Sequence, residues 1–474
     1  MAVTEATRRW RVEGPVEGTP TLLLGNFDLA AHGYVVEEFF LDGTARSYSE
    51  GANGVEPSDD AEYRTRFVVV RPSDPSECSG TVVVEWLNVS GGGDGCPDWA
   101  FMHRHIMRTR SVFVAASAQR VGIEGGGILG DMGTALKQVA PERYDSLQHP
   151  GDAFSFDMYT EIGEALRGDP ALLGGIEPKC VIAVGESQSA VFLVSYINKV
   201  DALAQVYDAF LVHGRGSRGA SLTGEGIRRD PDADPTDLAA ATARFRQEAA
   251  DPIPDARVPV ITVQSETDVV GMYGFGARCD DSANTRLWEI AGAAHFDTWG
   301  MIAAHEDDGT LSVERLAEVG GPTDEPLGMK SEEAINCGPQ QHYVLMAALA
   351  HLEQWAREGT PAPHAPLLAT TGERDTLALE RDEHGNVRGG LRTPWVDVPT
   401  AVLTGIGATG GGFTFLFGVT RPFDGSQLAA MYPGGVDEYI GKFESAAASA
   451  RAEGYLLDED ISEIVGVARA SWRG

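Results

Sequence analysis

The chain has 474 residues, 43% of them hydrophobic, and a formal net charge of −33 from 37 basic and 70 acidic side chains. This acidic excess excludes a nucleic-acid-binding protein, which needs a basic face, and it disfavours binding to an anionic membrane surface. We therefore expect no nucleic acid and no membrane as a partner.

The N-terminal residues 1–14 are polar, and no apolar segment follows them that would serve as a signal peptide. No run approaches the roughly 18 apolar residues of a transmembrane helix. The five cysteines are widely spaced, odd in number and without a Cys-x-x-Cys pair, so they predict neither a metal site nor a disulfide framework. A cytoplasmic location fits these features best.

Apolar or alternating runs at residues 33–40 and 63–71 predict the first, antiparallel strands of a sheet. Apolar runs and helical patterns then alternate along the chain, which predicts a mostly parallel central sheet flanked by helices on both faces. The predicted strands lie at 81–87, 111–116, 181–184, 206–212, 258–263 and 285–290, and the predicted helices at 98–110, 154–167 and 190–200.

Residues 1–32 are predicted as an N-terminal segment and residues 33–360 as the core, which an amphipathic helix at 340–357 completes. Residues 216–257 interrupt the alternating pattern and contain four prolines, so we expect a small, partly helical lid there. A surface excursion without a role in the site is the alternative. Residues 361–474 are predicted as a C-terminal extension packed on the core.

The strongest functional signal is the sequence Gly-Glu-Ser-Gln-Ser at residues 185–189, between a predicted strand and a predicted helix. A Ser in a sharp strand-to-helix turn is the nucleophile elbow of the α/β-hydrolase fold. The turn is strained and needs small neighbours, which Gly185 and Ser189 supply. The pattern predicts Ser187 as a nucleophile, although a chance match to such a short pattern is expected in a chain of this length.

Two further strand ends supply a candidate acid and a candidate base. The run 258–263 leads to Asp268, and the run 285–290 leads to His295. The order Ser, acid, His, each just past a strand, is that of the α/β-hydrolase fold. His295 would act as the general base and Asp268 would orient it. Glu266 is the alternative acid, because residues two apart share a face in an extended segment.

The oxyanion hole is expected to consist of two backbone N–H groups. One belongs to Gln188, the residue after the nucleophile, and the other to the loop after the strand 81–87. In that loop Val89 is the preferred donor and Asn88 the next. The glycines that follow at 91–93 would let the backbone approach a substrate, and no Gly-Lys-Ser/Thr sequence follows that would make this a phosphate-binding loop.

Three further residues are candidates for substrate binding. His213 follows a predicted strand, Arg215 would meet a substrate carboxylate, and Trp86 would contribute to an apolar pocket. A structural role is the alternative for each of them. There is no His-Glu-x-x-His sequence and no Cys/His cluster, so the sequence predicts no metal and no cofactor.

The chain resembles the bacterial "alpha/beta hydrolase domain-containing" proteins, a family of expected esterases, from about Gly33 onward. In that family Gly-x-Ser-x-Ser is the usual elbow and both acid positions are present, so the resemblance leaves Asp268 and Glu266 open. The resemblance implies an α/β-hydrolase fold and a serine hydrolase acting on carboxylic esters, without naming a substrate. It rests on Tyr63-Arg64-Thr65-Arg66, Glu85-Trp86-Leu87-Asn88, Ser117-Ala118-Gln119-Arg120-Val121-Gly122, Gly185-Glu186-Ser187-Gln188-Ser189 and Trp288-Glu289-Ile290-Ala291-Gly292-Ala293-Ala294-His295.

Together these features predict a serine hydrolase that cleaves a small-molecule ester through an acyl-enzyme intermediate. A lactonase, an amidase or an acyltransferase would use the same residues. A non-catalytic binding protein on the hydrolase fold is the alternative from a different class. The sequence leaves the natural substrate open, and also whether the chain forms a homo-oligomer.

Overall fold

The computed structural model contains a nine-stranded sheet with the strand order β1-β2-β3-β5-β4-β6-β7-β8-β9. The structure describes residues 9–52, 54–126, 133–225, 249–410 and 413–474. The first strands pair antiparallel up to the β3–β5 contact, and all pairs from β5 through β4 to β9 are parallel. The predicted mostly parallel sheet is confirmed.

The parallel strands are short and their residues are buried throughout, as expected for strands covered on both faces. Their continuous apolar runs made them readable in the sequence to within a few residues. The strands are β1 (Trp10–Glu13), β2 (Tyr34–Gly51), β3 (Gly54–Pro72), β4 (Thr81–Trp86), β5 (Val112–Ala116), β6 (Cys180–Glu186), β7 (Ala209–His213), β8 (Val260–Gln264) and β9 (Thr285–Glu289).

Helices cover both faces of this sheet. On one face α5 (Ser155–Gly168) and α6 (Gln188–Ser195) pack on a cluster that includes Phe67 and Val69 of β3. On the other face α1 (Pro97–Arg108) and α11 (Gln340–Glu358) pack on a cluster that includes Val68 and Val70. The alternation along β3 divides its side chains between the two cores.

The antiparallel part of the sheet is larger than predicted. β2 and β3 form a long hairpin that pairs as far as Gly51 and Gly54, well beyond the apolar runs at 33–40 and 63–71. Backbone pairing continues there although the side chains become polar and exposed. β1 lies inside the predicted N-terminal segment 1–32 and forms the edge strand on β2, so residue 33 does not mark the start of the sheet.

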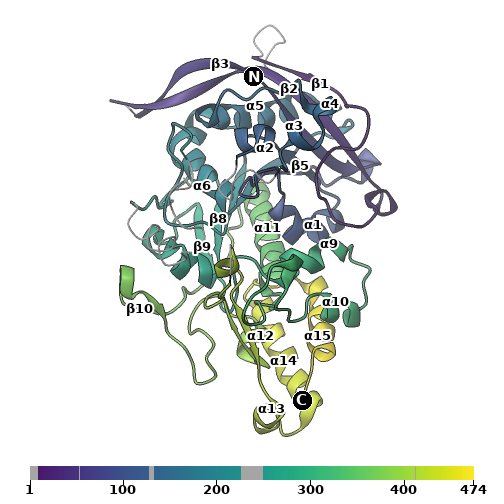
Figure 1. Ribbon diagram of the computed structural model, residues 1–474, viewed down its shortest axis with the longest axis vertical. Helices are drawn as coiled ribbons and strands as arrows, with labels where there is room; N and C mark the ends of the chain where they lie inside the picture. Colours follow the sequence, from purple (N-terminus) through teal and green to yellow (C-terminus); the bar gives the residue numbers. More distant parts are fainter. Residues whose placement is uncertain (1–8, 53, 127–132, 226–248, 411–412) are drawn as a thin grey trace.

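The C-terminal helices of the chain lie at the end of the molecule opposite the β2–β3 hairpin (Figure 1). Of these, α14 (Gly435–Ala452) and α15 (Ile461–Ala470) contribute Tyr439, Phe443 and Ile464 to a hydrophobic cluster that also contains Tyr343 and Met346 of α11. Residues 361–474 also contain α12 (Pro394–Asp397), α13 (Gly425–Met431), and the two-stranded sheets β10 (Thr370–Thr371) with β11 (Ala378–Leu379) and β12 (Ala401–Thr404) with β13 (Val419–Pro422).

Of the predicted lid at 216–257, residues 226–248 lie outside the described residues. Within the part of the chain that the structure describes, no helix combines the length and the apolar composition needed to cross a bilayer. The other α-helices among the described residues are short: α2 (Arg120–Glu124), α3 (Leu136–Val139), α4 (Pro141–Tyr144), α7 (Asp201–Ala204), α9 (Ala304–Glu306) and α10 (Val313–Val319).

Candidate active site

Ser187 lies in the sharp turn between β6 and α6, with a backbone φ of 55° and ψ of −113°. Positive φ is costly for a residue that carries a Cβ, and such strain concentrates at functional sites. Ser189 closes the turn, since its hydroxyl donates to the Glu186 carbonyl at 2.8 Å and accepts from the Glu186 N–H at 3.0 Å. The serine at the place of the more common glycine therefore holds the elbow together.

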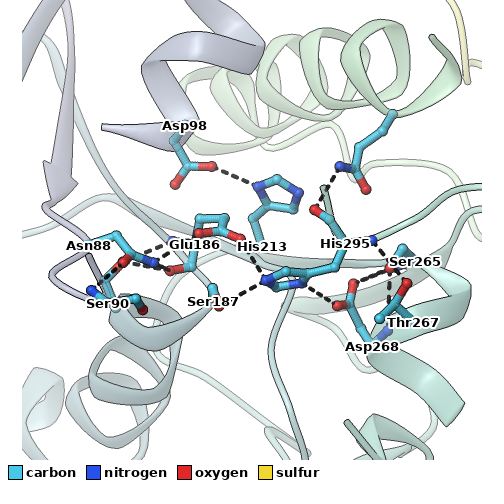
Figure 2. A network of polar contacts seen from close by, with 12 residues as sticks. Asn88, Ser90, Asp98, Glu186, Ser187, His213, Ser265, Thr267, Asp268 and His295 are labelled. Atoms are coloured by element: carbon cyan, nitrogen blue, oxygen red, sulfur yellow. Dashed lines mark hydrogen bonds and ion pairs between the residues drawn. The ribbon is translucent and has the colours of Figure 1, made fainter. Parts of the chain in front are cut away.

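Three side chains from separate strand ends meet beside this turn (Figure 2). His295 Nε2 lies 2.9 Å from Ser187 Oγ, and His295 Nδ1 lies 2.6 Å from Asp268 Oδ1. The other carboxylate oxygen of Asp268 accepts from the Ser265 N–H at 2.6 Å and from the Ser265 hydroxyl at 2.8 Å. The structure thus connects the nucleophile, base and acid candidates in one chain of hydrogen bonds.

Glu266, the alternative acid, has other partners. Its Oε1 accepts from the Gly292 N–H at 2.8 Å, and its Oε2 accepts from the Thr404 hydroxyl at 2.8 Å and the Gly405 N–H at 3.0 Å. The two carboxylates diverge because the segment is not extended: Glu266 has helical φ and ψ and precedes a helical turn, Thr267–Gly271. Residues two apart point to different sides of such a turn. Glu266 instead ties this segment to the C-terminal residues.

A second carboxylate reaches His295 from the elbow itself. Glu186 Oε1 lies 3.1 Å from His295 Nε2, and both side chains are almost fully buried. Burial favours the neutral imidazole, but the charges of Asp268 and Glu186 outweigh it and raise the pKa of His295 to about 10. The sequence contained Glu186 within the predicted elbow, but nothing in the pattern indicated where its carboxylate would point.

The predicted oxyanion donors differ in their present partners. The N–H of Gln188 lies at the N-terminus of α6, where backbone N–H groups have no partner within the helix. The Val89 N–H donates to the side-chain Oε1 of Gln188 at 3.2 Å, and the Gln188 amide in turn donates to Gln119 Oε1 at 3.0 Å. The Asn88 N–H donates to the Gly95 carbonyl at 2.9 Å, so the fold already uses it.

The three predicted substrate-binding residues are buried. Trp86 is packed among aromatic rings of α5 and α6, and its indole donates to Gln119 at 3.2 Å. The guanidinium of Arg215 donates to backbone carbonyls of its own loop, including that of Asp251, and burial lowers its pKa to about 10. His213 Nδ1 lies 2.9 Å from the buried carboxylate of Asp98. These contacts support the structural alternative for all three.

A family model described as "Alpha/beta hydrolase domain" (Abhydrolase_10) matches residues 9–466. The chain belongs to this family. Membership of the alpha/beta hydrolase domain family confirms the predicted fold class and the predicted resemblance, and it makes the protein a member of a hydrolase family. A search of curated proteins finds no match to the chain.

Several solved structures are similar to part of this alpha/beta hydrolase. A thermostable esterase from Pseudomonas putida ECU1011 is 13% identical, with a TM-score of 0.28, over 53% of this chain and 70% of that chain. The esterase Est22 is 9% identical, with a TM-score of 0.29, over 54% and 72% of the two chains. A glucuronoyl esterase from Teredinibacter turnerae T7901 is 12% identical, with a TM-score of 0.27, over 56% and 62%.

The loop that carries Val89 in this alpha/beta hydrolase is anchored by a buried ion pair. Arg66 is fully buried and donates to Asp94 at 2.8 Å, to Glu38 at 2.9 Å and to the hydroxyl of Ser117 at 3.0 Å. Asp94 lies in that loop, between β4 and α1. The sequence motifs around Arg66 and Ser117 were visible, but the pairing joins segments far apart in the chain and was not predicted.

Gly122 leaves the space that the Asp94 carboxylate occupies. A Cβ at residue 122 would lie 2.0 Å from Asp94 Oδ1, whereas a Cβ at Gly91 would meet no atom within 4 Å. We expect Gly122→Ala to destabilise the fold by about 1–3 kcal/mol through overpacking, and Gly91→Ala, in the same loop region, to have little effect. Urea unfolding of both variants measures this difference, and equal stability of the two would contradict the anchoring role of Asp94.

Proposed function

We propose that this alpha/beta hydrolase is a serine esterase that cleaves a small-molecule carboxylic ester through an acyl-enzyme intermediate. The observation that carries the proposal is the continuous path from Ser187 Oγ through His295 to Asp268, with distances of 2.9 and 2.6 Å. A nucleophile within hydrogen-bond reach of a base, which a third group orients, is the arrangement that activates a serine.

In the proposed reaction the Ser187 oxygen attacks the ester carbonyl carbon while His295 Nε2 takes the hydroxyl proton. The imidazolium then gives this proton to the departing alkoxide oxygen, and the acyl group stays on Ser187. Water, deprotonated by the same nitrogen, releases the carboxylic acid. Asp268 accepts the hydrogen bond from His295 Nδ1 and thereby keeps Nε2 free to accept a proton.

The oxyanion of the tetrahedral intermediate would lie between the N–H groups of Gln188 and Val89. The Val89 N–H would exchange its present acceptor, Gln188 Oε1, for the substrate oxygen. The side-chain amide of Gln188 donates to Gln119, which also accepts from the Trp86 indole. These hydrogen bonds connect the start of α6, the segment after β5 and the end of β4. Binding of the substrate requires the Gln188 side chain to leave the Val89 N–H. The two donors themselves are backbone groups, of the loop after β4 and of the first residue of α6, and donors held by the fold need little reorganisation when charge develops on the substrate oxygen.

The test combines covalent labelling with turnover. The protein is treated with a fluorophosphonate and the modified peptide is located by mass spectrometry. In parallel, p-nitrophenyl esters from acetate to decanoate are assayed. We expect modification of Ser187 and hydrolysis of at least one ester. The dependence of the rate on acyl chain length then indicates how long an acyl group the site accommodates. A folded protein that shows neither labelling nor turnover would be a non-catalytic member of the fold.

A further inference from the structure

Among the residues that the structure describes, Glu186 is the one whose carboxylate lies within hydrogen-bond distance of His295 Nε2, the nitrogen that faces Ser187. Its Oε1 lies 3.1 Å from His295 Nε2, the same nitrogen that lies 2.9 Å from Ser187 Oγ. Asp268 Oδ1 lies 2.6 Å from the other ring nitrogen, Nδ1. The imidazole therefore has a carboxylate within hydrogen-bond distance of each of its two nitrogens (Figure 2).

The Glu186 carboxylate is held in this position by the loop after β4. Asn88 Nδ2 donates to Glu186 Oε2 at 3.0 Å and to the Glu186 carbonyl at 3.1 Å. Asn88 is itself fixed, because its Oδ1 accepts from the Ser90 N–H at 2.8 Å. Oε2 is bound in this way, whereas the buried Oε1 accepts no hydrogen bond from the described residues and lies 3.1 Å from His295 Nε2. A buried carboxylate oxygen without a donor is costly.

We propose that Glu186 is a catalytic residue that pairs with the Nε2–H of His295 whenever Ser187 does not accept that hydrogen bond. This inference rests on the proposed serine esterase function. The proton that His295 takes from Ser187 stays on Nε2 until the leaving oxygen receives it. In the interval the imidazolium donates from Nδ1 to Asp268 and from Nε2 to Glu186. Glu186 gains and loses no proton, and it contributes a counter-charge.

The two carboxylates make His295 a strong base. At neutral pH they also leave only a small fraction of the imidazole in the neutral form that can accept a proton. The charged groups around His295 are Asp268 after β8, Glu186 at the end of β6, and the pair formed by His213 at the end of β7 and Asp98 on α1. Burial favours the neutral ring, but the two contacting carboxylates raise the pKa of His295 to about 10. Only neutral imidazole accepts the Ser187 proton, so activity must rise as pH increases through this pKa.

The experiment measures the second-order rate of inactivation by a fluorophosphonate from roughly pH 5 to pH 10. Wild type is compared with Glu186→Gln, with Glu186→Asp, and with Glu142→Gln as a control at an exposed glutamate. We expect a half-maximal pH well above 7 for wild type and for the control. We expect it to fall by at least about one pH unit in Glu186→Gln, a tenfold change in the ionisation constant, and by less in Glu186→Asp.

An unchanged midpoint in Glu186→Gln overturns the role of Glu186, because loss of stability alone does not move an ionisation. Titration of wild-type protein with ¹⁵N-labelled histidine gives a readout that needs no variant. A His295 imidazolium that persists above pH 8 agrees with the proposal, and a His295 that titrates near the ordinary histidine pKa overturns it. Absence of labelling in wild type at every pH would overturn the esterase proposal instead.

Discussion

Ser187→Ala is expected to lower kcat by about 10⁶-fold on any ester that the wild type hydrolyses, because removing the nucleophile of such a triad has an effect of this size. The serine hydroxyl is the only reacting group that the substitution removes. His295 and Asp268 keep their contact, and the Gln188 and Val89 N–H groups stay in place. Residual hydrolysis should therefore exceed the uncatalysed reaction. A loss of less than about tenfold would show that another group attacks the ester.

Ser187→Gly separates the chemistry of this residue from its backbone strain. Both variants lack the nucleophile, but only glycine adopts the observed φ of 55° and ψ of −113° without a penalty. We expect Ser187→Gly to be more stable than Ser187→Ala by about 1 kcal/mol, since strained positions cost about 1–3 kcal/mol and glycine loses more entropy on folding. Urea unfolding measures the difference. Equal stability would mean that the strain at this position is no larger than the roughly 0.5–1 kcal/mol that glycine loses in entropy.

The parts of this fold that could be predicted are those that depend on local sequence. Each parallel strand is a short, continuously apolar run, since both of its faces are covered, and each was predicted within a few residues. The carboxyl ends of parallel strands meet at one edge of the sheet. That rule alone was sufficient to bring Ser187 and His295 together from positions 108 residues apart.

The parts that could not be predicted depend on contacts between distant segments or on local geometry. The sequence could not show whether Asp268 or Glu266 contacts His295, because an extended segment would place both side chains on one face. The structure has a helical turn there, which directs the two side chains to different sides. The Glu266 link to Thr404 spans 138 residues, and the Arg66–Asp94 pair joins a strand to a loop. Hydrogen bonds between distant segments leave no periodic pattern in the sequence from which they could be predicted. The direction of the Glu186 side chain is likewise set by Asn88, from another loop.

Asp268→Asn is expected to lower kcat by about 10⁴-fold while the fold is retained. An Asn amide that donates toward His295 Nδ1 favours the tautomer with the proton on Nε2, and that tautomer cannot accept the Ser187 proton. The Ser265 N–H and hydroxyl can still bond the remaining carbonyl oxygen, so the loss of stability should be small. Steady-state kinetics and urea unfolding of the same preparation measure the two effects separately.

Glu266→Gln is the matched control, because it removes the neighbouring buried carboxylate. Its two oxygens accept three hydrogen bonds, from Gly292, Thr404 and Gly405, and a glutamine amide would place donors against donors there. We expect a loss of about 1–3 kcal/mol of stability, the cost of unsatisfied buried groups, with kcat of the folded protein nearly unchanged. The opposite pattern, a large loss of kcat in Glu266→Gln and an active Asp268→Asn, would make Glu266 the acid. That result would require the helical turn after β8 to rearrange when substrate binds.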